Sequence, residues 1–122
     1  MLFTPLGLDH IVLRVRDQAT SQKFYTDVLC CKIERVNPEI SLIQLRFGEH
    51  LIDLLPGQRS DDGLEHYCLS ITCDDLAGLA ESFRARGVAM EGEIFPRTGA
   101  WGRSPSFFIR DPDGYLIELK PR

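Results

Sequence analysis

The stretch 111–121 reads Asp-Pro-Asp-Gly-Tyr-Leu-Ile-Glu-Leu-Lys-Pro and predicts a tight turn followed by a β-strand. Its first four residues are typical of a tight turn, because proline fixes its own φ angle and glycine takes positive φ without steric cost. Alternate side chains of a strand face opposite sides, so Glu118 faces away from Ile117 and Leu119. A carboxylate on the inner side of an apolar strand costs free energy unless something pairs with it. We expect the rest of the chain to supply that partner.

The bulk composition suits one globular domain. A chain of 122 residues is the length of one domain, and 43% hydrophobic with 26% charged residues is enough to bury a core. The net charge of −4 disfavours nucleic acid or an anionic membrane surface as the main partner. No apolar run approaches the length of a membrane span.

The N-terminus and the cysteines predict a cytoplasmic protein. The first five residues, Met-Leu-Phe-Thr-Pro, lack the basic region and the long apolar core of a signal peptide. Cys30 and Cys31 are adjacent, while Cys68 and Cys73 lie in or beside a predicted strand. None of these pairs has the spacing of a metal site or of a disulfide framework, so we expect reduced thiols in a reducing compartment.

Hydrophobic periodicity predicts the same order of elements twice, β-α-β-β-β. Asp17 or Thr20 caps the first helix, and Asp74 or Asp75 caps the second, which Gly87 ends. The expected strands are 8–15, 32–36, 42–47 and 50–55 in the first half, and 66–72, 91–95, 106–110 and 115–120 in the second.

Similar segments in the two halves of the sequence indicate a duplication. Asp9-His10 matches Glu65-His66 at an offset of 56, whereas the segment 51–56 matches 116–121 at an offset of 65. The second copy therefore carries an insertion, which we place in the Gly- and Pro-rich segment 96–105. The predicted organisation is one domain over 1–122. Its modules are 8–56 and 64–121, joined by a linker over 57–63.

Strand alternation places two histidines and two acids on the face of each sheet that its helix leaves open. The four residues are His10, Asp53, His66 and Glu118. If the two modules form a curved, open α+β sheet with its helices outside, these side chains face a cleft. Two imidazoles with one or two carboxylates suit a divalent ion such as Fe, Mn, Ni, Co or Zn. The metal ligands are predicted to be His10, His66 and Glu118.

Several simpler interpretations stay open. A single histidine at a strand start is usually a surface or hydrogen-bonded residue. Its repetition in both halves, each time with a matched acid, is what favours a metal site. His50 lies on the opposite face of its strand from Asp53, so it is not a candidate ligand. Cys68 shares the face of His66 but suits a small core thiol. Asp53 is a metal ligand, a catalytic base beside the metal or an exposed acid at a strand end.

Two further residues are candidates for binding substrate. Arg14 shares the face of His10, where a guanidinium would bind a carboxylate or phosphate, or extend to the rim. Trp101 lies in the segment 96–105, whose composition suits a lid over a cleft or an ordinary connection with one packed tryptophan.

These motifs resemble the vicinal oxygen chelate superfamily, which includes glyoxalase I, fosfomycin-resistance enzymes, extradiol dioxygenases and bleomycin-binding proteins. The resemblance rests on the stretches 8–15, 24–29, 65–71 and 111–119 and covers nearly the whole chain. It implies two tandem βαβββ modules that form a curved open sheet around a metal-binding cleft, with the helices outside.

Locally the chain is similar to bacterial glyoxalase I, which places His, Glu, His and Glu on its metal. The matching positions are His10, Asp53, His66 and Glu118, so Asp replaces Glu at the second. The strand-one arginine of that family, which contacts the glutathione end of the substrate, matches Arg14. The stretch between Asp53 and His66 is shorter than in glyoxalase I.

The resemblance implies a metal-dependent, glyoxalase-like lyase or isomerase whose substrate chelates the metal through vicinal oxygens. Glu118 or Asp53 would act as the catalytic acid–base group that moves a proton on the adjacent carbon. The alternatives are a thiol transferase that opens epoxides, an Fe(II) dioxygenase, and a non-catalytic drug-binding protein. Short two-module chains of this superfamily usually form homodimers, often with a site built from both subunits.

Overall fold

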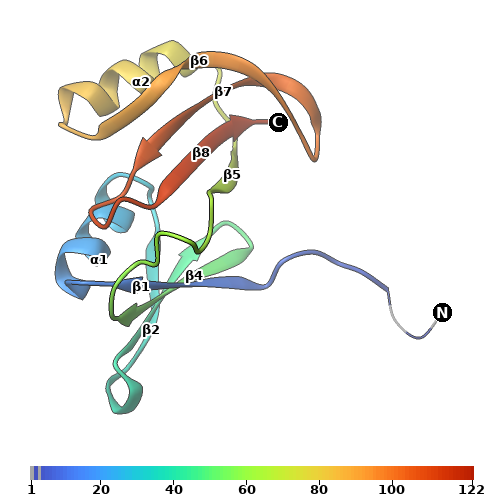
Figure 1. Ribbon diagram of the computed structural model, residues 1–122. Helices are drawn as coiled ribbons and strands as arrows, with labels where there is room; N and C mark the ends of the chain where they lie inside the picture. Colours follow the sequence, from blue (N-terminus) through green and yellow to red (C-terminus); the bar gives the residue numbers. More distant parts are fainter. Residues whose placement is uncertain (1, 3) are drawn as a thin grey trace. The chain divides into compact units, whose positions relative to one another are not determined.

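The computed structural model describes residues 2 and 4–122, which divide into two compact units, one that ends at Arg59 and one that begins at Ser60. Each unit has the order β-α-β-β-β, each has one four-stranded mixed sheet, and neither sheet closes into a barrel (Figure 1). The predicted α+β class with two tandem βαβββ modules is confirmed.

The first unit contains one mixed sheet and one α-helix. Its elements are β1 (His10–Val15), α1 (Gln18–Asp27), β2 (Lys32–Asn37), the 3-10 helix η1 (Pro38–Ile40), β3 (Leu42–Phe47) and β4 (His50–Pro56). The strand order is β1-β4-β3-β2. The first and last strands of the module, β1 and β4, are parallel neighbours, and the other pairs are antiparallel.

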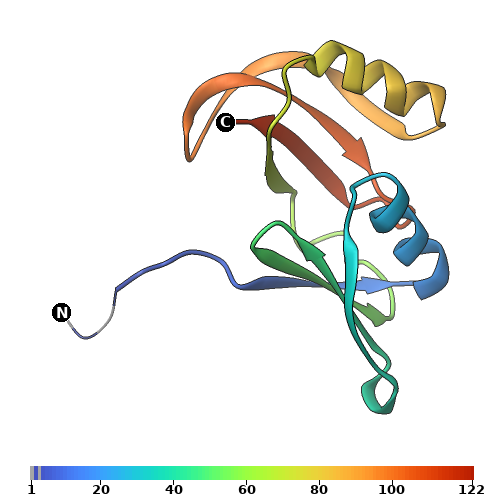
Figure 2. The ribbon, with the colours of Figure 1, turned by 180° about the vertical axis from the view of Figure 1, so that it is seen from behind.

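The second unit repeats this topology. Its elements are β5 (Tyr67–Ile71), α2 (Leu76–Ala85), β6 (Ala89–Gly99), β7 (Gly102–Arg110) and β8 (Leu116–Pro121). The strand order is β5-β8-β7-β6, with β5 and β8 parallel (Figure 2). In both units the parallel pair therefore brings the first and last strands of a module side by side.

Alternation along the strands separates a buried face from the opposite face. Leu13 and Val15 are buried in the first unit, and Ile117 and Leu119 are buried in the second. Val12, which lies between two inward-facing residues of β1, is half exposed. The predicted strand parity is therefore confirmed, and it leaves the other face of each sheet for polar side chains.

The helices begin where short acids can cap them. Asp17 accepts hydrogen bonds from the backbone N–H groups of Ala19 and Thr20, and Asp75 accepts one from that of Gly78. These bonds satisfy N–H groups that have no partner within the helix. Of the alternative caps that the sequence allows, the structure selects Asp17 and Asp75.

The segment 96–105 is a β-hairpin end rather than a long loop. The paired strands β6 and β7 run up to Gly99 and Gly102, so that only Ala100 and Trp101 form the turn. Gly102 has a φ of 99°, which suits glycine and permits this tight reversal. The insertion of the second copy lengthens two strands, so the segment is not the long loop that the sequence suggested, and its role over the cleft stays a prediction.

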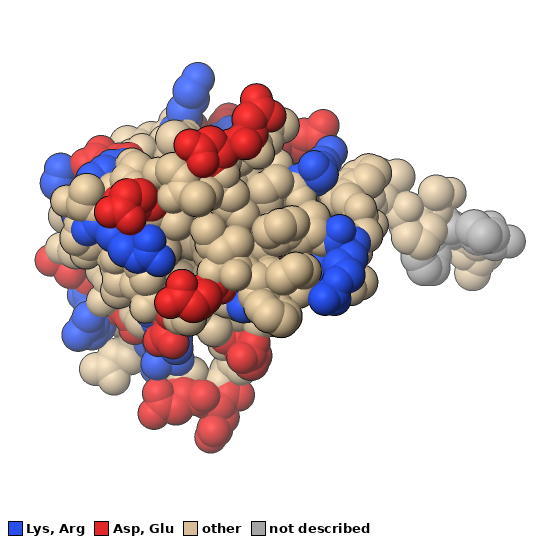
Figure 3. All heavy atoms as spheres, turned by 90° about the horizontal axis from the view of Figure 1, so that it is seen from above, with Lys and Arg blue, Asp and Glu red and all other residues tan. Residues whose placement is uncertain are grey.

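Figure 3 views the molecule from above and shows acidic and basic side chains interspersed on that face.

The helices α1 and α2 have only ten residues each. Within residues 2 and 4–122, no helix has the length and apolar character needed to cross a membrane.

Replacing Leu13 with Ala should lower the free energy of unfolding by about 2–5 kcal/mol, because the change leaves a cavity in the core beneath α1. Leu13 is only 2% exposed, whereas its neighbour Val12 is 49% exposed and lies on the opposite face. Val12→Ala is the matched control and should cost less than about 1 kcal/mol. Urea denaturation measures both values, and equal losses would contradict the assignment of faces.

Candidate functional site

In each unit, a histidine at the start of the first strand lies beside the acid of the last strand. The parallel pairing places Val12 opposite Asp53 and Cys68 opposite Glu118. Val12 and Cys68 each lie two residues after the histidine of their strand. The distance between His10 Nε2 and Asp53 Oδ2 is 3.9 Å. The distance between His66 Nε2 and Glu118 Oε1 is 3.4 Å. The duplication thus builds one histidine–carboxylate pair per unit.

A second acid holds the other ring nitrogen of each histidine. His10 Nδ1 lies 2.7 Å from Asp9 Oδ1, and His66 Nδ1 contacts Glu65 Oε2 in the same way. A carboxylate that accepts a hydrogen bond from Nδ1–H places the proton of a neutral imidazole on Nδ1, which leaves the lone pair on Nε2. Both imidazoles therefore present Nε2 to the inner carboxylate, in the orientation that a metal-binding histidine requires.

The inner carboxylates are buried and are oriented by the neighbouring strand. Asp53 is 4% exposed, and its Oδ2 accepts a hydrogen bond of 3.2 Å from Gln44 Nε2. Glu118 is 7% exposed, and its Oε2 accepts a hydrogen bond of 2.7 Å from Ser106 Oγ. Each acid thus has one donor on the adjacent strand while it faces a histidine.

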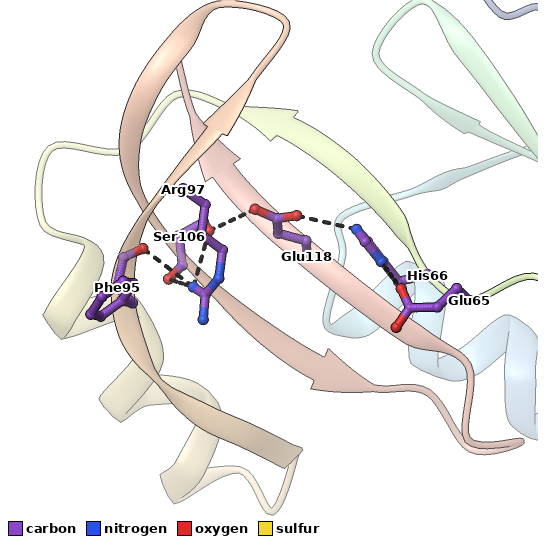
Figure 4. A network of polar contacts seen from close by, with 6 residues as sticks. All are labelled: Glu65, His66, Phe95, Arg97, Ser106 and Glu118. Carbon is purple, nitrogen blue, oxygen red and sulfur yellow. Dashed lines mark hydrogen bonds and ion pairs between the residues drawn. The ribbon is translucent and has the colours of Figure 1, made fainter.

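Ser106 is held in turn by an arginine of β6 (Figure 4). Arg97 Nη1 donates to Ser106 O at 2.8 Å and to Ser106 Oγ at 3.2 Å. The Arg97 guanidinium lies 4.7 Å from the centre of the Phe108 ring, which also meets the His66 ring edge to face. These contacts restrict the rotamers of Ser106 and His66 and thereby the position of Glu118.

The donor atoms fit a divalent metal ion. Imidazole nitrogen and carboxylate oxygen are ligands that first-row divalent ions accept. Asp53 Oδ1 is buried and has no hydrogen-bond partner, which is costly for a carboxylate oxygen that has no cation nearby. Within the described part of the chain, no group of three or more His, Cys, Asp or Glu side chains is arranged to hold a metal ion. Each unit by itself supplies two candidate ligands.

The structure places the two candidate substrate residues at the ends of strands. Arg14 Nη1 donates to the carbonyl oxygen of Pro56 at 3.2 Å, where β4 ends. Trp101 lies at the β6–β7 turn, is 68% exposed, and has the Arg122 guanidinium 4.5 Å from its ring centre. Binding of substrate by Arg14 and Trp101 stays a prediction.

Cys68 differs from the expected core thiol. It is exposed and lies opposite Glu118 in the sheet register. Partial desolvation and the nearby Glu118 charge raise the pKa of the Cys68 thiol to about 11. The thiol is therefore protonated at neutral pH and is a weak nucleophile.

The outer acids and the cross-strand donors were not assigned a role from the sequence. The outer acids had a detectable signal, because an acid precedes the histidine in both copies: Asp9 before His10 and Glu65 before His66. Gln44 and Ser106 have no comparable sequence signal. Their positions beside the carboxylates follow from strand pairing, which the sequence pattern does not specify.

Comparisons with known proteins agree with this geometry. Residues 7–119 match the family model described as the Glyoxalase/Bleomycin resistance protein/Dioxygenase superfamily. A probable lactoylglutathione lyase of Vibrio parahaemolyticus is 31% identical, with 90% of this chain and 86% of that protein covered. A lactoylglutathione lyase of Haemophilus influenzae is 34% identical, with coverage of 90% and 88%. The solved integron cassette protein from the V. cholerae mobile metagenome has a TM-score of 0.79, 31% identity, and coverage of 99% and 98%.

Asp9→Asn should lower the pKa of His10 in the metal-free protein. The Asp9 hydrogen bond is the main cause that raises this pKa above its ordinary value, and it is partly offset by desolvation. Histidine binds metal in its neutral form, so the raised pKa makes metal binding more sensitive to acid. NMR titration of the imidazole resonances measures the change. Asp27→Asn is the control on the surface, and an unchanged His10 pKa in Asp9→Asn would contradict the role of Asp9.

Proposed function

Because the chain belongs to the glyoxalase/bleomycin resistance protein/dioxygenase superfamily, we propose that it is a metal-dependent lyase or isomerase of the glyoxalase type. The observation that supports this most is the repeated arrangement of an outer acid, a histidine and a buried inner carboxylate. It occurs as Asp9–His10–Asp53 and again as Glu65–His66–Glu118.

The proposed metal ligands are His10, His66 and Glu118, with Asp53 as a fourth ligand or as a base beside the metal. These nitrogen and oxygen donors suit Ni, Zn, Mn, Co or Fe. When bound, such an ion would supply Lewis-acid polarisation of vicinal oxygens on a small substrate. Asp53 is one methylene shorter than glutamate, and its unpaired Oδ1 is the atom available for either role.

Glu118 is the proposed group that moves a proton. Ser106 holds Oε2, so the opposite oxygen, Oε1, remains directed toward His66 Nε2. The Phe108 ring, which lies directly opposite Glu118 on β7, limits access of water from that side. Arg14 and Trp101 are the proposed contacts for the rest of the substrate.

Replacement of Glu118 by Gln tests this assignment, because Gln keeps the shape and removes the base. We expect divalent ions to raise the melting temperature of the wild-type protein. Conversion of a glutathione hemithioacetal to lactoylglutathione should fall by about 100-fold or more in Glu118→Gln. Asp53→Asn in the same assays shows whether Asp53 contributes to metal binding, to turnover, or to neither.

Glu91→Gln is the matched control, since Glu91 pairs with Arg110 on the surface of the same sheet. It should leave turnover and metal stabilisation unchanged. Full turnover in Glu118→Gln would overturn the proposed base. A wild-type protein that no divalent ion stabilises would support a non-catalytic binding protein. Activity that requires Fe(II) and consumes oxygen would support a dioxygenase.

We also propose that the chain forms a homodimer in a reducing compartment such as the cytoplasm. All four cysteines are free thiols, which suits such a compartment. The first unit exposes the apolar side chains of Ile33 and Val36 on β2, and their burial against a second copy would be favourable.

Light scattering during size exclusion should therefore give a mass of about twice the 13.8 kDa of the chain. A substitution of Val36 by Asp should shift this mass toward the monomer, because it would place a charge in the apolar contact. Lys32→Asp is the control on the same strand, with an exposed polar side chain in place of an apolar one. A monomer at micromolar wild-type concentration would contradict the dimer.

A further inference from the structure

Lys120 is a buried cation without an acidic partner. Its side chain lies on the same face of β8 as Glu118 and is only 7% exposed. Its Nζ donates to Ser104 O at 3.1 Å and to Ser104 Oγ at 2.5 Å. Among the described residues, no carboxylate lies within ion-pair distance of Nζ. An ammonium group has three N–H donors, so at least one remains for another acceptor.

The fold itself does not require a cation at this position. In the duplicated first unit the equivalent of Lys120 is Leu55, because segment 51–56 matches segment 116–121. Leucine fills the same place in the same topology without any charge to desolvate. Burying an ammonium group without an ion-pair partner costs free energy, so Lys120 is expected to be less stabilising at this position than leucine.

Arg97 adds a second cation to this face of the sheet. Its guanidinium donates only to neutral oxygens, those of Phe95 and Ser106, and lies over the Phe108 ring. As with Lys120, no carboxylate among residues 2 and 4–122 forms an ion pair with it. Figure 4 shows the Arg97 guanidinium beside Ser106, the residue that also contacts Glu118.

Hydroxyl groups surround the two cations. Ser104 contacts Lys120, Ser106 contacts Arg97, and Ser70 lies directly opposite Lys120 on β5. Ammonium and guanidinium groups are donors that bind carboxylate or phosphoryl oxygens, whereas the two serine hydroxyls already donate to Pro121 O and to Glu118. Neither cation has a carboxylate within ion-pair distance among the described residues, so a bound anion would supply that partner.

We propose that Lys120 and Arg97, which Ser104 and Ser106 hold in position, bind an anionic group of the substrate beside Glu118. The anionic group is a carboxylate or a phosphoryl group, and a substrate without it binds more weakly. The identification of this anion as part of the substrate rests on the proposed role of Glu118. The anion site itself does not depend on metal or turnover.

A purely structural role for Lys120 is the competing explanation. The Lys120 stem lies beneath Gly99, where an added Cβ would come within 2.8 Å of Lys120 Cε. Ser104 Oγ also donates to the backbone of Pro121 at 3.0 Å. In that case the packing and hydrogen bonds of Lys120 would only stabilise the contact between the β6–β7 hairpin and β8. The two roles predict different effects when the charge is removed and the stem is kept.

Lys120→Met makes that change, and the outcome is measured by calorimetric titration of the full-length chain, freed of metal with EDTA that is then removed by dialysis. The probes are inorganic phosphate and, separately, acetate, and the tighter of the two identifies the anion class. We expect the affinity for the preferred anion to fall at least about tenfold in Lys120→Met, because a charge-assisted hydrogen bond is lost. The melting temperature should equal or exceed that of the wild-type protein.

Lys32→Met is the matched control, because Lys32 is an exposed lysine in the other unit. It should leave anion binding unchanged. As a measurement without any variant, phosphate or acetate should shift the backbone amide NMR signals of Ser104, Ser106 and Lys120 in the wild-type protein.

Equal anion affinity in the wild-type protein and Lys120→Met, or no binding of either anion, would overturn the proposal. A lowered melting temperature with unchanged anion binding would establish the structural role instead. Because the titrations contain no metal, their failure leaves the Glu118 assignment intact. If Glu118 proves not to be the base, a positive anion titration would still support the anion site.

Discussion

A carboxylate buried in a sheet must be compensated, and this constraint organises each unit of the protein. Ile117 and Leu119 are in the core, so strand alternation forces Glu118 onto the opposite face. That face is also shielded, since Glu118 is only 7% exposed. Its charge is tolerated because His66 and Ser106 each approach one carboxylate oxygen. The parallel pairing of β5 with β8 is what makes the contact with His66 possible.

The first unit solves the same problem with different residues. Asp53 pairs with His10 and takes its cross-strand hydrogen bond from Gln44, an amide in place of the Ser106 hydroxyl. In both units the backbone topology is retained while the side chains around the acid differ. The second unit in addition has Lys120 where the first has Leu55. The two copies thus share a scaffold for a histidine–carboxylate pair, and a lysine at this position of the last strand is found in the second copy only.

Rigid strands, rather than loops, position the polar side chains described here. Ser106, Glu118 and Arg97 all belong to the sheet of the second unit, so hydrogen bonds along the backbone determine their spacing. Aromatic contacts reinforce this, because Phe108 packs against both His66 and Arg97. A site built in this way keeps its geometry without a ligand, which reduces the conformational entropy lost on binding.

The sequence by itself determined which elements form, which faces are buried, and that two histidines and two acids belong to one repeated pattern. Those properties follow from local periodicity and from comparison of two similar segments. Only the tertiary structure decided which donor approaches each acid, because the register between distant strands depends on the whole sheet. It also decided that the Gly- and Pro-rich segment 96–105 ends a hairpin, since those residues are equally common in loops and tight turns. The burial of Lys120 likewise arises from side chains far apart in sequence.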